Sequence, residues 1–452
     1  MRRATLRALF ATLLALTASV PVFAQDLLSV WSAALQRDPV YAAARAGRNA
    51  DQEKIPQARA RLLPYITLDS AGELEDVRRT RNFQHHETRR VGLWALTLTQ
   101  PVFDVGRWGQ LRQSQYIAGS ADLALQQAYQ DLILRVAQAY FEILAAQDSL
   151  KTIQAQKQAV ETQLHAAERG FEVGATTVTD IHEARSRLDL LNASEIEAHN
   201  ILQVSTDQLA KIIGERPGPL LGLAIETSLP APTPARLDDW TAQSSQASLD
   251  VARAHLDTLI IEKQIDIAQS GRYPSVSLYA QTGSASDRGI YGQRNGPRSL
   301  DSVVGLQLSI PIFSGGEVSS QVREQTSRLQ QARYIYEAAK RQAVQSTQQY
   351  FSGVISGLAR IRALRAAEES SQASLDANRT GYELGVRINI DVLNAQQQLY
   401  ETRRALSRAR YDTLMSSLRL KAASGILSDQ DIVAINELLD APTASTNHRS
   451  DG

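Results

Sequence analysis

Leu96-Thr-Leu-Thr-Gln-Pro101-Val-Phe103 recurs 210 residues later as Leu306-Gln-Leu-Ser-Ile-Pro311-Ile-Phe313, and this repeated stretch decides the fold. A second pair of prolines keeps the same distance, because Pro274 follows Pro64 by 210 residues. Phe171-Glu-Val-Gly174 likewise recurs as Tyr382-Glu-Leu-Gly385, with 211 residues between the two glycines. A nearly constant offset over three landmarks indicates that one structural unit has been duplicated.

The residues around the repeated prolines have the period of β-strands. Val304, Leu306 and Leu308 alternate with Gly305 and Gln307, and the same alternation precedes Pro101. An apolar side chain at every second position over about ten residues is typical of a strand in a membrane β-barrel. We expect strands at 65–74, 90–101, 274–283 and 300–311. The four prolines would mark the junctions between strand and helix: Pro64, Pro101, Pro274 and Pro311.

The segments after each strand pair have the period of long helices. Residues 106–170 and 317–381 contain no proline, and their apolar residues recur mostly in steps of three and four. At 1.5 Å per residue, about 60 residues would form a rod roughly 90–100 Å long. A second helix follows each repeated glycine, at 180–211 and at 391–424. Two shorter helices are expected at 27–62, broken or kinked at Pro39 and Pro56, and at 248–270.

The strands allow two interpretations. They are either two small soluble hairpins or the membrane part of the protein. Four strands cannot close a barrel, and an open sheet edge is not tolerated in lipid. The membrane interpretation therefore requires several copies to pool their strands, and three copies would supply twelve.

The start of the chain predicts export from the cytoplasm. Arg2, Arg3 and Arg7 precede a short apolar run, and residues 22–24 supply a small residue for cleavage. This pattern predicts a signal peptide at 1–24, which leaves Gln25 as the mature N-terminus. A membrane anchor is the alternative, but the apolar run is short for a bilayer span.

Composition excludes several classes of function. The chain has 48 basic and 48 acidic residues, so its net charge gives no indication of a nucleic-acid partner, which would require a basic face. It has no cysteine, which excludes disulfides, thiolate metal sites and a lipid anchored on cysteine. Only 14 prolines and 25 glycines occur in 452 residues, as expected of long helices.

These elements divide the chain into five parts. After the signal peptide come a first repeat at 25–213, a linker at 214–247 and a second repeat at 248–424. A C-terminal segment at 425–452 ends in a polar tail at 441–452, which is expected to be disordered.

The most specific motif lies in the second repeat. Gly381-Tyr-Glu-Leu-Gly-Val-Arg-Ile-Asn-Ile-Asp-Val-Leu-Asn394 continues through Leu399-Tyr-Glu-Thr-Arg to Gly425-Ile-Leu-Ser-Asp-Gln-Asp431. Together with the duplicated strand–proline–helix junction, this motif resembles the TolC family of trimeric outer-membrane channel-tunnels. The resemblance covers about 27–439, which is nearly the whole mature protein.

The resemblance implies a mainly α fold with membrane β-structure. Three chains of four strands each would form a 12-stranded barrel in the outer membrane, continued by a long α-helical coiled-coil barrel in the periplasm. A mixed equatorial belt would come from 214–241 and from the segment after Gly425. The implied function is a gated, passive export duct of a tripartite efflux pump or type I secretion system. Its implied partners are a periplasmic adaptor protein and an inner-membrane pump or ABC exporter, with the adaptor docking on the helix tips near Gly174 and Gly385.

The resemblance also implies the residues of a pore constriction and its gate. Asp391 falls on the position of an acidic ring. Asn394 falls where relatives carry a second aspartate, so this departure removes a charge. Tyr382 and Arg387 match the pair that ties the coiled coils shut, and Thr179 with Asp180 match their partners in the first repeat.

Each of these residues also has a simpler interpretation. Asp180 and Asp391 lie just inside a helix start, where a carboxylate is favoured by about 0.3–1 kcal/mol. Thr177 and Asp180 also have the spacing of a capping box. Arg387 is equally compatible with a surface cation and Tyr382 with a core aromatic residue.

The sequence predicts no catalytic site, cofactor or metal. His85 and His86 are adjacent in a polar segment and lack further ligands at suitable spacing. Ser314-Gly-Gly316 lacks the lysine of a phosphate-binding loop. The main alternative to the duct is a soluble periplasmic coiled-coil adaptor or structural protein, although it does not explain why alternating strands precede Pro101 and Pro311 in both repeats. An enzyme ranks third.

Overall fold

The computed structural model describes residues 24–78, 86–224, 227–285 and 299–440. The predicted signal peptide, the polar segments between paired strands, His85 and the predicted tail lie wholly or mostly outside these ranges. The chain divides into two compact units. One contains the residues up to Tyr41, 129–240 and those from Ser346 onward, and the other contains 42–128 and 241–345.

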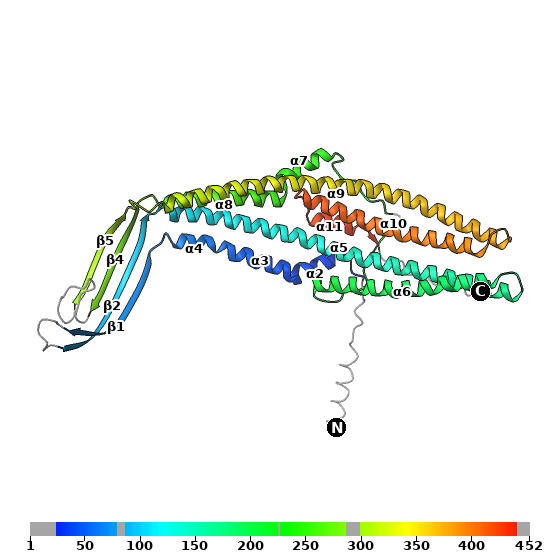
Figure 1. Cartoon of the computed structure of the whole chain (residues 1–452), viewed down its shortest axis with the longest axis horizontal. Coiled ribbons are helices and arrows are strands. Elements are labelled where there is room, and N and C mark those ends of the chain that lie inside the picture. The colour runs from blue at the N-terminus through cyan, green and yellow to red at the C-terminus, as the bar shows by residue number, and fades with distance from the viewer. Residues whose placement is uncertain (1–23, 79–85, 225–226, 286–298, 441–452) are drawn as a thin grey trace, which may run out of the picture. The chain divides into compact units, whose positions relative to one another are not determined.

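The second unit contains a four-stranded antiparallel sheet (Figure 1). Its strands are β1 (Tyr65–Arg78), β2 (His86–Phe103), β4 (Ser275–Ala285) and β5 (Ser299–Ser309), in the order β1-β2-β4-β5. Each repeat supplies one hairpin, and the two hairpins join where β2 pairs with β4, for example at Thr97 and Gln281. The sheet therefore ends on β1 at one side and on β5 at the other.

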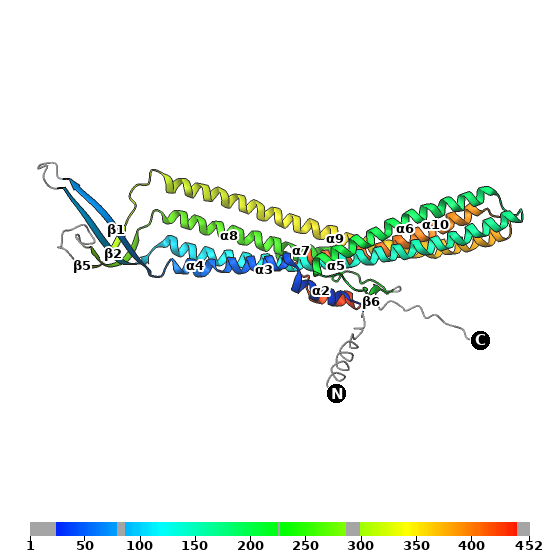
Figure 2. The same cartoon turned by 90° about the horizontal axis from the view of Figure 1, so that it is seen from below.

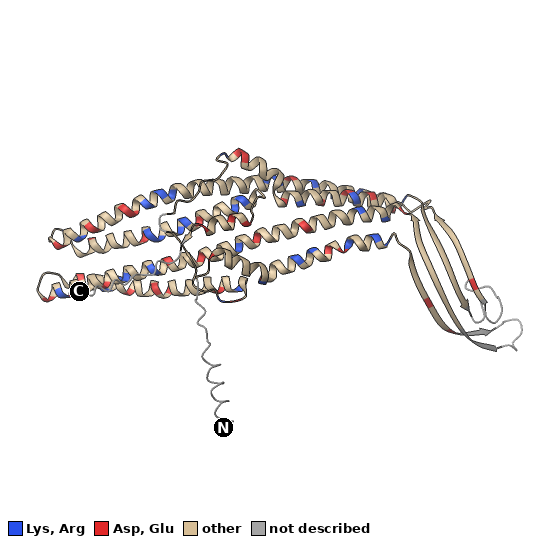
Figure 3. Cartoon of the chain, turned by 180° about the vertical axis from the view of Figure 1, so that it is seen from behind, with Lys and Arg blue, Asp and Glu red and all other residues tan. Residues whose placement is uncertain are grey.

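Large apolar side chains on these strands are exposed. Leu68, Leu306 and Leu308 are 69%, 69% and 60% exposed, respectively. Charged residues are spread along the helices, whereas the described parts of the strands carry very few (Figure 3). An apolar exposed surface of this kind is unusual for a sheet in water.

The prolines at the ends of the strands take different positions. Pro64 and Pro274 directly precede β1 and β4, and Pro311 lies two residues beyond β5. Pro101, however, lies inside β2, opposite Ser277, where the pairing with β4 shifts register between Pro101 and Phe103. A proline has no N–H to donate to the ladder and is tolerated at such an irregularity. The strand β2 therefore continues past Pro101 to Phe103, and α5 begins at Val105.

The stretch 27–62 forms three helices: α2 (Leu27–Arg37), α3 (Pro39–Gln52) and α4 (Lys54–Ala60). The first break is at Asp38, which is extended because the residue before a proline is disfavoured in the helical region. The second break is at Glu53 rather than at Pro56. Pro56 lies in the first turn of α4, where no N–H is needed.

Two long helices, α5 (Val105–Glu172) and α9 (Glu317–Glu383), have residues in both units. Near its start, α5 packs against α8 (Leu249–Ser270). A Cβ atom on Gly109 would lie only 2.8 Å from Cγ1 of Ile267, so glycine permits this close approach.

In the first unit, α5 pairs with α6 (Val178–Ile213) and α9 pairs with α10 (Asn389–Ala423). Both pairs lie side by side in Figures 1 and 2. No helix in the described ranges combines the length and apolar content needed to cross a bilayer.

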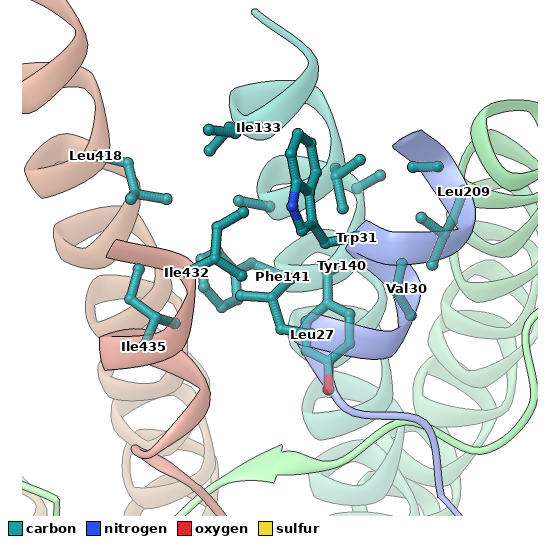
Figure 4. Close-up of a cluster of buried hydrophobic side chains, with 14 of the residues drawn as sticks. Leu27, Val30, Trp31, Ile133, Tyr140, Phe141, Leu209, Leu418, Ile432 and Ile435 are labelled. Carbon is teal, nitrogen blue, oxygen red and sulfur yellow. The ribbon is translucent and has the colours of Figure 1, made fainter. Parts of the chain in front are cut away.

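The largest core lies where α5, α6 and α10 meet α2 and α11 (Asp429–Asn436) (Figure 4). Trp31, Tyr140 and Phe141 are almost fully buried in it. The ring of Phe141 stacks on that of Tyr411, with 5.8 Å between the ring centroids. Next to this core, β3 (Gly222–Leu223) pairs with β6 (Leu439–Asp440). The structure thus brings together the two segments that the resemblance assigns to the equatorial belt.

Two helices were not expected from the sequence. One is α11, in the segment 425–452 that was interpreted as an equatorial segment and a tail. The segment 214–247, interpreted as a linker, contains α7 (Leu237–Ala247). Trp240 is 1% exposed and packs with Val354 and Leu420. Eleven residues are too few for a clear periodic pattern, and this tertiary contact holds the helix in place.

Candidate functional site: the tips of the two helical hairpins

The turns after α5 and α9 share one backbone conformation. Gly174 and Gly385 both have φ of 75°, a left-handed value that favours glycine. The N–H of Ala175 donates to the carbonyl oxygen of Gly170 at 2.7 Å, and that of Val386 donates to Gly381 at 2.9 Å. The repeated glycines therefore end one helix and reverse the chain into the next.

A second glycine supports each turn and was not among the predicted site residues. A Cβ atom on Gly170 would lie 2.7 Å from Cγ2 of Thr176, and one on Gly381 would lie 2.7 Å from Cγ of Arg387. In both repeats, the residue two positions after the left-handed glycine folds back over the last turn of the preceding helix. The signal was present, since Gly170 and Gly381 also stand 211 residues apart.

The first tip is closed by a reciprocal cap. Thr177 precedes α6, and its hydroxyl oxygen accepts from the N–H of Asp180 at 3.3 Å. The carboxylate of Asp180 accepts from the N–H of Thr177 at 2.9 Å and from its hydroxyl at 2.8 Å. The capping interpretation of Asp180 is thus observed within the chain. Thr179 is exposed.

The second tip lacks this cap. Ile388 occupies the capping position and its side chain makes no capping hydrogen bond. Asp391 instead has the guanidinium of Arg387 3.7 Å from its carboxylate, and the two side chains are 33% and 59% exposed. An exposed ion pair of this kind contributes little to stability. The carboxylate of Asp391 is not committed to a cap.

Tyr382 is half-buried at the second tip. Its ring packs against a buried apolar cluster of Leu375, Val392 and Leu399. Burial raises the pKa of Tyr382, and the negative charge of Asp180 raises this pKa further. Within one chain, the structure therefore brings Tyr382 near Asp180 but pairs Arg387 with Asp391.

Two contacts between the repeats were missed by the sequence analysis. Asn389 is 1% exposed; its oxygen accepts from Nε2 of Gln163 at 2.6 Å, and its nitrogen donates to the carbonyl of Asp180 at 3.3 Å. Asn394 accepts a hydrogen bond from Nη2 of Arg187 at 2.5 Å. Both contacts join α6 or α5 of the first repeat to α10 of the second, and no local pattern reveals such pairs.

The tips also expose apolar side chains. Val173 and Leu384 occupy equivalent positions and are 80% and 74% exposed, and Val386 is 75% exposed. In the described residues, no group of three or more histidine, cysteine, aspartate or glutamate residues is arranged to hold a metal ion. The side chains of His85 and His86 are outside the described part of the structure.

A sequence model for the family described as "Outer membrane efflux protein" matches residues 30–215 and 240–426. The chain belongs to the outer membrane efflux protein family. The two matched ranges coincide closely with the two repeats, and members of this family are transport proteins.

Curated relatives give the same result. The chain is 34% identical to "Outer membrane protein TolC" of Escherichia coli, over 94% of this chain and 87% of the relative. It is 30% identical to "Alkaline protease secretion protein AprF" of Pseudomonas aeruginosa, over 91% and 90%. Like these members of the efflux protein family, it is an outer-membrane export duct of the efflux or type I secretion kind.

Solved structures of the family have the same fold. The Campylobacter jejuni CmeC outer membrane channel superimposes with a TM-score of 0.78 at 16% identity, covering 92% of this chain and 90% of that one. VceC of Vibrio cholerae gives 0.75 at 21%, covering 88% and 96%. The expected mainly α fold of a channel-tunnel protein and the outer-membrane location are confirmed, and the soluble periplasmic alternative is not supported.

Proposed function

We propose that three copies of this chain close a 12-stranded barrel through which substrates leave the cell passively. The four-stranded sheet carries this proposal, because in the described residues it ends on β1 and β5 and exposes Leu68, Leu306 and Leu308. An edge strand in lipid leaves backbone groups without hydrogen-bond partners, and closure with neighbouring copies removes the edges. Twelve strands then arise from three chains.

Disulfide crosslinking tests the number of copies. The chain has no cysteine, so introduced thiols are the only ones present. Thr67→Cys on β1 is combined with a cysteine at one of several β5 positions, such as Ser302 or Val304. We expect oxidation to give a covalent trimer as the largest product. A ladder that ends at the dimer or continues beyond the trimer would contradict the proposal.

We propose that the tips of α6 and α10 form the periplasmic constriction, with Asp391 as its acidic ring. Asp391 is favoured over Asp180 because the Asp180 carboxylate is held by Thr177, whereas that of Asp391 faces only Arg387 across 3.7 Å among the contacts described. Threefold symmetry would bring three copies of Asp391 together and attract cations into a narrow opening.

A planar bilayer with a salt gradient tests this constriction. We expect small cation-selective steps from the wild type and weaker selectivity from Asp391→Ala, measured as a shift in reversal potential. Asp207→Ala, which removes an exposed carboxylate near the other end of α6, is the matched control and should leave selectivity unchanged. Equal selectivity of wild type and Asp391→Ala would remove Asp391 from the constriction.

We further propose that Tyr382 and Arg387 hold the constriction closed, with Thr179 and Asp180 as partners. Tyr382 lies near Asp180 of its own chain, and Arg387 is exposed enough to reach a neighbouring copy. Tyr382→Phe combined with Arg387→Ser should raise single-channel conductance. Unchanged conductance would remove both residues from the gate.

The proposed partners are a periplasmic adaptor and an inner-membrane pump or ABC exporter, since the chain is proposed to act as a passive duct without catalysis or cofactor. The exposed apolar side chains around Gly174 and Gly385 provide the docking surface. The division of the sequence into signal peptide, two repeats and equatorial segments belongs to this proposal. N-terminal sequencing of the mature protein should find Gln25 first.

A further inference from the structure

Arg187 is a charged residue in the third turn of α6, and no sequence pattern indicated its position. It lies on α6 of the first repeat and binds two residues of α10 in the second. Its Nη2 donates to Oδ1 of Asn394 at 2.5 Å, and its Nη1 donates to Oε1 of Gln397. Two neutral amides therefore hold the guanidinium in place without cancelling its charge.

Asn394 and Asp391 lie on the same side of α10. They are three residues apart, which places them on one helix face with an axial separation of about 4.5 Å. The opposite side of the helix is buried through Val392, Leu393 and Gln396. Asp391 is half-buried and Asn394 is exposed. Arg187 thus carries a positive charge to the level just beyond Asp391.

The guanidinium lies beside open space. Arg187 lines a cavity of about 380 Å³ between α5, α6 and α10, together with Leu190, Leu393 and Gln397. Three other charged residues line this cavity farther along the helices: Glu197, Glu401 and Arg404. Glu401 is seven residues beyond Asn394 and Glu197 is ten beyond Arg187, distances of about 10 and 15 Å along a helix. Of the charged residues that line this cavity, Arg187 is the one at the level of Asn394.

We propose that Arg187 is a selectivity-determining residue, which sets a positive charge beside Asn394 and opposes the attraction of cations by Asp391. The inference rests on the proposed constriction at Asp391. Within one chain, Arg387 already faces the carboxylate of Asp391, and Arg187 adds a second cation one turn away. The amide of Asn394 preserves this charge, since a carboxylate at that position would pair with the guanidinium and neutralise it. A constriction of this composition passes anionic groups more readily than one with two acidic rings.

Reversal potentials of the full-length mature protein in a planar bilayer under a potassium chloride gradient test the proposal. Arg187→Gln removes the charge and should raise the cation-to-anion permeability ratio by at least about twofold, which is the effect of one charge about 8 Å away in water. Arg187→Lys keeps the charge but loses the fork of two hydrogen bonds. It should retain the wild-type ratio.

These two variants separate charge from structure. If Arg187 only ties α6 to α10, the Lys and Gln variants should lose stability equally, and neither should change the permeability ratio. Asn394→Asp provides a second test that keeps Arg187, and it should shift the ratio in the same direction as Arg187→Gln. The double variant Arg187→Gln/Asp391→Ala loses one charge of each sign and should return close to the wild-type ratio.

The outcomes also distinguish this inference from the proposed constriction. If Asp391→Ala changes the ratio while Arg187→Gln and Asn394→Asp do not, the role of Arg187 is refuted and the constriction stands. If none of the three changes the ratio, the constriction itself is wrong. A wild-type ratio in Arg187→Lys with a raised ratio in Arg187→Gln supports the proposal.

Discussion

The two hairpin tips have the same backbone but different side-chain chemistry. Both contain a glycine with φ of 75° and a backbone hydrogen bond that closes the turn. Thr177 of the first tip corresponds to Ile388 of the second, 211 residues later. The first tip therefore satisfies its polar groups locally, whereas the second leaves Asp391 outside a cap and buries Asn389 against the first repeat. Duplication has preserved the turn in both tips, and the side chains of the second tip make contacts outside their own hairpin.

The largest difference concerns Asn389, which corresponds to the half-exposed Val178 of the first tip. Asn389→Ala removes a buried amide that bridges Gln163 and the carbonyl of Asp180. We expect the free energy of local opening at the start of α10 to fall by about 2 kcal/mol. Hydrogen exchange of the tip peptides measures this. Val178→Ala is the matched control and should cost less than about 0.5 kcal/mol; equal costs would mean that the bridge contributes nothing.

The caps provide the next test of the comparison. Thr177→Ala removes the acceptor for the N–H of Asp180, and we expect the start of α6 to open more easily by about 1 kcal/mol. Ile388→Ala is the equivalent change in the second tip and should have almost no effect, because Ile388 makes no capping hydrogen bond. Hydrogen exchange in the first turns of α6 and α10 compares the two. A comparable loss at both tips would contradict the difference.

The reverse substitution should make the second tip resemble the first. Ile388→Thr places a hydroxyl at the cap with Asp391 three residues later, as in Thr177 and Asp180. We expect a gain of about 0.5 kcal/mol in the local stability of α10. Because Asp391 would then accept from the cap, the cation selectivity of the channel should fall. Unchanged protection of the first turn of α10 would show that the backbone there cannot form the cap.

Much of this fold could be predicted because its signals are local or repeated. The offset between Pro101 and Pro311 exposed the duplication, and the glycine turns gave the hairpins. Helix α7 was missed because its stability comes from Trp240 packing against Val354 and Leu420, which lie far away in the sequence. Pro101 was placed at the end of a strand because a bulge depends on the partner strand, which the sequence of β2 alone does not reveal.

The site was predictable only in part, for the same reason. Asp180 was recognised as a capping residue from the spacing of Thr177 and Asp180 alone. The pairing of Arg187 with Asn394 spans 207 residues and follows no periodic pattern. The resemblance identified Asn394 as a missing charge, whereas the structure shows which side chain stands beside it.

The smallest expected effect concerns Tyr382, which corresponds to Phe171 in the first tip. Burial and the charge of Asp180 raise the pKa of Tyr382 above its ordinary value of 10.0. The folded protein therefore holds this proton more tightly than the unfolded chain, so the associated stability is present below about pH 10 and is lost as the pH rises above it.

Tyr382→Phe has no proton to lose. The difference in unfolding free energy between wild type and variant, measured by urea titration, should be constant up to about pH 9 and should then move against the wild type. In Asp180→Asn the onset should stay at the same pH, because the unfolded chain sets it, but the total loss of stability should be smaller, because only burial remains to raise the pKa of Tyr382. A loss in Asp180→Asn as large as in the wild type would show that Tyr382 does not sense the first tip.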